Sequence, residues 1–131
     1  MSKRILIVDD EPDIVSYLEM LLQDQGYETS TAGNGNEALE AVRENPPDLV
    51  TLDITMPEAS GTRFYKEVRT DPELAKIPVI IVTAVTGLGG DKHAYEKFIS
   101  NRSLVPAPEA YFPKPIDREA FVKAVNGLLN D

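Results

Sequence analysis

The chain has 131 residues, no cysteine and a formal charge of −9 at pH 7. This length suits a single domain over residues 1–131, with a core large enough to fold without disulfides. The negative charge disfavours direct binding to nucleic acids and to anionic membranes. No apolar stretch approaches the roughly 20 residues of a membrane span. Because the lack of cysteine also suits a reducing compartment, we expect a soluble, cytoplasmic protein.

Short apolar runs alternate with amphipathic segments along the whole chain. The predicted strands are Ile5–Val8, Tyr27–Thr31, Leu49–Leu52, Val79–Val82 and Ala110–Phe112. The predicted helices are Pro12–Gly26, Asn36–Glu44, Thr62–Thr70, Asp91–Ile99 and Asp117–Leu129. The first, third and fourth strands are almost free of polar alternation, as expected for strands covered on both faces. The alternation predicts one α/β domain built on a doubly wound, five-stranded parallel sheet.

Charged residues follow several of these strands at their carboxyl ends. Asp9 and Asp10 follow the first strand, Asp53 follows the third, and Lys114 comes just after the fifth. In open α/β sheets ligands bind at this edge. Carboxylates gathered there repel one another unless a cation offsets their charge. Because no His or Cys accompanies them, the oxygen ligands favour Mg²⁺ or Mn²⁺.

The same edge has the groups needed for phosphoryl transfer. Asp53 is expected close to the metal, where its carboxylate can attack a phosphoryl group and form an aspartyl phosphate. Lys114 supplies a cation for the transferring oxygens. Thr83, which closes the fourth strand, offers a hydroxyl donor to another of them. These residues therefore predict a phospho-acceptor site.

This ordered set resembles the receiver domain of two-component response regulators, the CheY-like family. The resemblance covers residues 3–129 and rests on Asp9 and Asp10 in ILIVDDEP, Asp53 with Met56, Pro57 and Gly61, Thr83 ending VIIVT, and Lys114 with Pro115. Each motif alone is common, whereas the set, with each member at its own strand end, is specific. The resemblance implies a flavodoxin-like (βα)5 receiver architecture. It also implies a phosphoprotein that works in a phosphorelay and switches a protein-interaction surface in signal transduction.

The resemblance further implies which groups hold phosphate and metal. Asp53 would accept the phosphoryl group from a sensor histidine kinase or a phosphotransfer protein. Mg²⁺ would be bound by Asp10 directly, by Asp9 largely through water, by Asp53, and by the backbone carbonyl of Thr55.

A second group of residues would respond to phosphorylation on the family pattern. Lys114 would pair with the phosphoryl group, Thr83 would move toward it, and Tyr111 would swing inward as the switch aromatic. The peptide bond between Lys114 and Pro115 would be cis, against a base rate of about 5% for such bonds.

Two further features concern the lifetime of the aspartyl phosphate and the surface that contacts a partner protein. Thr55 and Val85 flank the approach of the attacking water in the family and would tune the lifetime of the aspartyl phosphate. Neither has a carboxamide or carboxylate to orient water, so we expect slow to moderate autodephosphorylation. The stretch 87–109 is longer than receivers usually have, which predicts a non-standard partner surface.

Other classes of function remain open on the sequence. A haloacid-dehalogenase-like phosphatase also uses an Asp nucleophile and Mg²⁺, but its second Asp, two residues on, is here Thr55. A flavodoxin-like nucleotide binder would present backbone N–H groups, not carboxylates, in its first loop. A pseudo-receiver would act only as a binding module. We expect a signalling domain rather than an enzyme, whose effector is a separate protein or a linked output domain.

Overall fold

The structure is a computed structural model that describes residues 3–53, 60–84, 109–114 and 116–129. Its parallel sheet has the strand order β2-β1-β3-β4-β5. The strands are β1 (Arg4–Val8), β2 (Glu28–Ala32), β3 (Leu49–Asp53), β4 (Val79–Ala84) and β5 (Ala110–Lys114). The helices are α1 (Pro12–Asp24), α2 (Gly35–Glu44), α3 (Ser60–Thr70) and α5 (Arg118–Leu129). The predicted α/β class and parallel sheet are confirmed, while the helix expected over Asp91–Ile99 lies outside the described residues.

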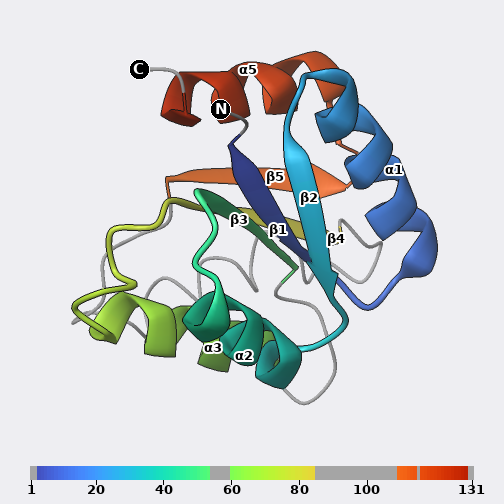
Figure 1. Ribbon diagram of the computed structural model, residues 1–131. Helices are drawn as coiled ribbons and strands as arrows, with labels where there is room; N and C mark the ends of the chain where they lie inside the picture. Colours follow the sequence, from blue (N-terminus) through green and yellow to red (C-terminus); the bar gives the residue numbers. More distant parts are fainter. Residues whose placement is uncertain (1–2, 54–59, 85–108, 115, 130–131) are drawn as a thin grey trace.

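Helices cover both faces of the sheet, with α1 and α5 on one face and α2 and α3 on the other (Figure 1). The two faces follow from the alternation of side chains along each strand. In β1, Ile5 and Ile7 pack with the α1 and α5 residues, whereas Leu6 and Val8 pack with those of α2 and α3. All five residues of β3 are buried, because this strand has a neighbour on each side and helices on each face.

Local sequence explains where α1 begins and ends. Pro12 occupies the first turn, where its missing N–H leaves no intrahelical hydrogen bond unmade. The chain leaves the helix at Gly26, whose φ of 91° lies in the left-handed region. The N–H of Gly26 donates to the Gln23 carbonyl at 2.9 Å, and that of Tyr27 donates to the Leu22 carbonyl at 3.2 Å. These bonds satisfy carbonyls that a helix end otherwise leaves without donors.

A variant of the capping box begins α2, in which Glu37 reaches back to the residue before the N-cap Asn34. The Glu37 N–H donates to the Asn34 side chain at 2.9 Å, and the Glu37 carboxylate accepts the Gly33 N–H at 3.1 Å. The helix therefore begins at Gly35, one residue before the predicted start. Likewise α3 begins at Ser60 rather than Thr62, and α5 at Arg118 because Asp117 caps it by accepting the Ala120 N–H at 3.1 Å.

The strands differ from their predicted bounds in a way that matters for the site. β4 runs one residue beyond Thr83, to Ala84, β5 runs two residues further than predicted, to Lys114, and β3 includes Asp53. Lys114 is thus the last residue of a strand rather than the first residue after it. Among the described residues, no helix is long and apolar enough to cross a membrane.

Candidate phospho-acceptor site

Two neighbouring strands bring the acidic residues to one edge of the sheet. Val8 at the end of β1 pairs with Leu52 in β3, so Asp9 and Asp53 follow paired residues on parallel strands. Neighbouring strands lie about 4.8 Å apart. The side chains at these two positions are therefore direct neighbours.

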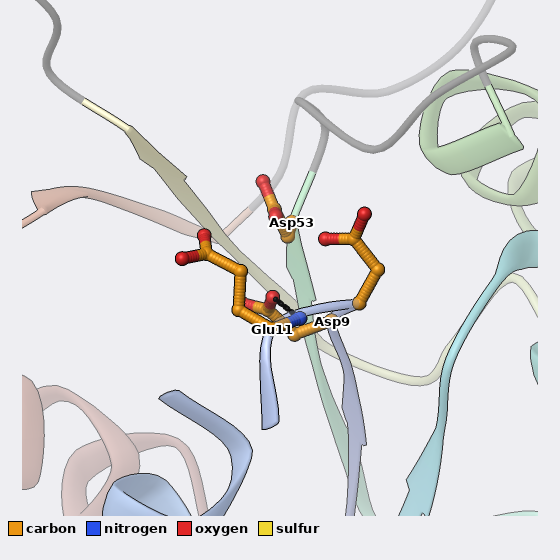
Figure 2. Close-up of side chains that lie close together, drawn as sticks. Asp9, Glu11 and Asp53 are labelled. Carbon is orange, nitrogen blue, oxygen red and sulfur yellow. Dashed lines mark hydrogen bonds between the residues drawn. The ribbon is translucent and has the colours of Figure 1, made fainter. Parts of the chain in front are cut away.

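Four carboxylates meet at this edge. One oxygen from each of Asp9, Asp10, Glu11 and Asp53 lies within 4.8 Å of those of the others. Asp9 and Asp53 are only 3% and 1% exposed, whereas Asp10 and Glu11 are exposed. Figure 2 shows the side chains of Asp9, Glu11 and Asp53 gathered at the ends of the strands. The cluster thus has two buried and two solvent-facing carboxylates.

Backbone hydrogen bonds fix the position of Asp9. Its N–H donates to the Ala32 carbonyl of β2 at 3.1 Å, continuing the pairing of β1 beyond the last strand residue. Its carboxylate accepts the N–H of Glu11 at 2.9 Å, which closes a tight turn before α1 (Figure 2). Asp9 and Asp10 also line a hollow of about 260 Å³ between this turn and Gly33.

The donor set fits a hard divalent cation. Carboxylate oxygens are the ligands that Mg²⁺ and Mn²⁺ take, and the group contains no His or Cys among its described members. Mg²⁺ in such sites keeps several waters and uses one or two carboxylates, so the two exposed groups leave room for a hydrated ion.

Sequence reasoning did not assign Glu11 to this cluster. Glu11 directly precedes Pro12, the first residue of α1, so its charge also lies at a helix N-terminus. The turn closed by Asp9 brings Glu11 back to the strand ends. An Asp three residues before a helix start is the sequence signal for such a turn.

The remaining expected residues divide into two groups. Thr83 lies in β4 beside β3, paired with Pro113, and Lys114 ends β5, paired with Ala84. Both backbones therefore reach the same edge as Asp53. Tyr111 lies further back, paired with Ile81. Thr55, Val85 and Pro115, and with them the expected metal-binding carbonyl, lifetime residues and cis peptide bond, lie outside the described residues.

The fold and the site thus define an open parallel α/β domain whose carboxylates cluster where ligands bind in such sheets, outside the carboxyl ends of the strands. Residues 5–126 match the response regulator receiver domain family. The chain belongs to this family and functions in two-component signalling.

Its relatives and structural neighbours agree with this assignment. The polar-differentiation response regulator DivK of Brucella anthropi is 37% identical over 131 residues, which cover 100% of this chain and 99% of that protein. A putative response regulator from Chloroflexus aurantiacus has a TM-score of 0.82 at 27% identity, with each chain covered completely. The chemotaxis response regulator CheY4 of Vibrio cholerae has a TM-score of 0.77 at 26% identity, covering 98% of this chain and 100% of that one.

Proposed function

We propose that Asp53 is the phospho-acceptor of this receiver and that it is phosphorylated in a Mg²⁺-dependent reaction. The observation that supports this most directly is the position of Asp53, which is 1% exposed, at the end of the central strand β3, and within 4.8 Å of three other carboxylates. A carboxylate held in this way is pre-positioned for attack, because the surrounding sheet prevents its movement.

The transfer itself exchanges one bond to phosphorus for another. A carboxylate oxygen of Asp53 forms an O–P bond while the bond from phosphorus to the donor breaks, and the donor atom leaves with the electron pair. The donor is a phosphohistidine of a sensor kinase or phosphotransfer protein. Asp10 and Asp9 would hold Mg²⁺ with Asp53 and the Thr55 carbonyl, and the ion would supply positive charge to the phosphoryl oxygens.

Lys114 and Thr83 are proposed to contact the phosphoryl group, and Tyr111 to respond to it. Their strands, β5 and β4, run to the same edge as β3, which supports this assignment. The chain would then act as one cytoplasmic (βα)5 domain over residues 1–131. Its only chemistry would be its own phosphorylation and dephosphorylation, and its output a change in the protein surface offered to an effector.

Labelling with a small acyl phosphate tests the proposal. Wild-type protein incubated with acetyl phosphate and Mg²⁺ is expected to gain the mass of one phosphoryl group, and Asp53→Asn is expected to gain none, because an amide is a poor nucleophile at phosphorus. Removing Mg²⁺ with EDTA should abolish labelling of the wild type. The measurement is intact-protein mass spectrometry followed by peptide mapping.

The matched control is Asp13→Asn, an exposed residue of the first turn of α1 outside the carboxylate cluster. It should label as the wild type does. Labelling that persists in Asp53→Asn would refute the proposed acceptor. Turnover of a phosphomonoester by the wild type would instead favour a phosphatase.

A further inference from the structure

A buried arginine of α3 contacts the residue that precedes β5. This contact lies at the amino ends of β4 and β5, whereas the carboxylate cluster lies at the carboxyl ends of the strands. The side chain of Arg69 is only 3% exposed, and its guanidinium forms an ion pair with Glu109. The same guanidinium donates to the carbonyls of Ala75 at 2.8 Å and Ile77 at 3.1 Å. It lies over the ring of Tyr65, 5.2 Å from the centroid. In the part of the chain that the structure describes, Glu109 is the one carboxylate paired with this cation.

Glu109 is also attached to the first residue of β4. Its carboxylate accepts the N–H of Val79 at 2.7 Å, and its own N–H donates to the Val79 carbonyl at 3.0 Å. Glu109 therefore contacts β4 through both its side chain and its backbone, one residue before β5 begins. Loss of the carboxylate partner would destabilise the folded protein, because it would leave the buried guanidinium charge uncompensated. The pair therefore fixes where β5 starts relative to α3 and β4.

The register of β5 decides where Lys114 lies. Ile80 pairs with Ala110 and Ala84 pairs with Lys114. A two-residue hairpin sets register through its own geometry, whereas a connection as long as residues 85–109 does not. The strand has five residues and an edge position, and Pro113 has no N–H to donate. A slip of one residue would turn every side chain of β5 to the opposite face. The contacts of Glu109 with Val79 and Arg69 oppose such a slip at the start of the strand.

We propose that the Arg69–Glu109 pair is a positioning device that sets the register of β5 and so holds Lys114 at the carboxyl edge. This role rests on the proposed function, in which Lys114 meets the phosphoryl group on Asp53. Neither member of the pair touches the reacting atoms. They act through the backbone of β5, which advances about 3.3 Å per residue. Fixing Glu109 at one end of the strand therefore fixes the position of Lys114 at the other end.

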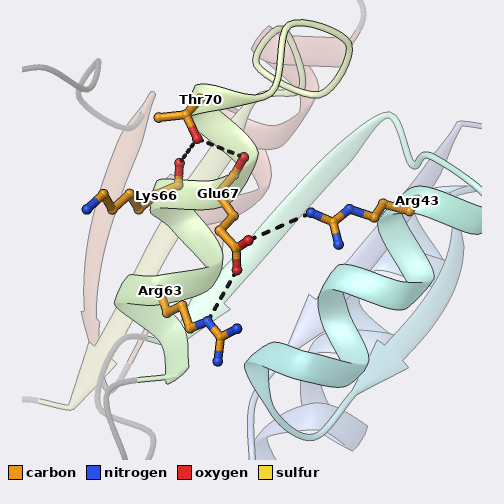
Figure 3. A network of polar contacts seen from close by, with 5 residues as sticks. All are labelled: Arg43, Arg63, Lys66, Glu67 and Thr70. Atoms are coloured by element: carbon orange, nitrogen blue, oxygen red, sulfur yellow. Dashed lines mark hydrogen bonds and ion pairs between the residues drawn. The ribbon is translucent and has the colours of Figure 1, made fainter.

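The test removes both charges together, so that the buried guanidinium is not left without its counter-charge. Arg69→Met/Glu109→Gln nearly preserves side-chain length, and the amide oxygen introduced at position 109 can still accept the Val79 N–H. The matched control is Arg63→Met/Glu67→Gln, the same chemical change on the same helix. Figure 3 shows this pair, in which the Arg63 Nε and a Glu67 carboxylate oxygen are 3.3 Å apart. The Arg63 side chain is 68% exposed.

Three measurements are made on each variant. The maximal rate of labelling by saturating acetyl phosphate should fall about tenfold or more in Arg69→Met/Glu109→Gln, because a misplacement of about 1 Å at a reacting centre has effects of this size. Mg²⁺ affinity, measured by calorimetry, should stay within about twofold, since its ligands follow β1 and β3. The backbone NOE contacts that report the pairing of Ile81 in β4 with Tyr111 in β5 should disappear. The control should match the wild type in all three.

Two outcomes overturn the positioning role. One is an unchanged set of β4–β5 NOE contacts in Arg69→Met/Glu109→Gln, whatever the labelling rate. The other is a parallel loss of labelling and Mg²⁺ affinity, which indicates general destabilisation. Failure of the proposed function has a different signature, namely a wild type that is not labelled or a Lys114→Ala variant that labels as the wild type does. In that case the NOE contacts still decide whether the pair sets the register.

Discussion

Asp9 has two roles that depend on different properties of its carboxylate. One oxygen accepts the N–H of Glu11 at 2.9 Å and closes the turn before α1. Its negative charge, at 3% exposure, adds to that of Asp53 in the cluster. An amide could accept the same hydrogen bond but would carry no charge. Asp9→Asn therefore separates the two roles.

Without a divalent cation, Asp9→Asn should raise the free energy of unfolding by about 1 kcal/mol, since it removes repulsion between like charges a few ångströms apart. With Mg²⁺ the order should reverse. The ion stabilises the folded wild type in proportion to its affinity, and the variant binds it less tightly. Urea unfolding followed by circular dichroism, in EDTA and at increasing Mg²⁺, measures both effects.

Asp13→Asn again serves as the control, because it removes a carboxylate near the same turn but outside the cluster. It should slightly lower stability through loss of a favourable charge at a helix N-terminus, by an amount that Mg²⁺ does not change. Equal stabilisation of the wild type and Asp9→Asn by Mg²⁺ would contradict a metal-binding role for Asp9.

At the scale of the elements, two glycines differ in backbone conformation, one at the end of a helix and the other inside a helix. Gly26 follows α1 with φ 91°, whereas Gly127 lies inside α5. Apart from the adjacent residues and, for Gly127, the nearby backbone of α5, a Cβ added at either position would meet no heavy atom within 4 Å. Any difference between Ala substitutions at these sites therefore reflects the backbone and not a steric contact.

Gly26→Ala should destabilise the protein by about 1–2 kcal/mol, because an L-residue in the left-handed region is strained. Gly127→Ala should stabilise it by up to about 1 kcal/mol, because Ala has the higher helix propensity. Denaturant unfolding of the two variants beside the wild type measures both signs. A stabilising Gly26→Ala would show that α1 does not end in the left-handed conformation.

At the scale of the whole molecule, one sheet supports two hydrophobic layers. Leu22 of α1 and Leu39 of α2 are 0% and 6% exposed and lie in the clusters on opposite faces. Both clusters include residues of β1, β3 and β4, alternating along each strand. Because each layer needs the same strands, neither should unfold without the other.

Leu22→Ala and Leu39→Ala should therefore each lower the stability of the entire domain, by about 2–5 kcal/mol, through the cavity that each creates. The single transition should shift as a whole when it is followed by circular dichroism and by tyrosine fluorescence. The smaller effect is expected for Leu39, which is less completely buried. Two separated transitions in either variant would contradict a single cooperative domain.

The sequence by itself determined the class of fold and the acidic composition of the candidate site. Buried parallel strands need continuous apolar runs, so the runs before Asp9 and Asp53 could be located and their carboxyl ends placed at one edge. Helix starts shifted by one residue at Gly35 and Arg118, because helix ends depend on capping contacts that periodicity does not report.

Only the tertiary structure decided which distant residues meet. Glu11 joins the cluster because a turn brings it back to the strand ends, and Arg69 meets Glu109 across 40 positions of sequence. The pairing of Arg69 with Glu109 leaves no periodic signal, since it depends on strand order and register and not on local propensity. The positions of Asp9, Asp10 and Asp53 could thus be predicted from the chain, whereas the place of Glu11 and the contact that holds β5 in register required the folded sheet.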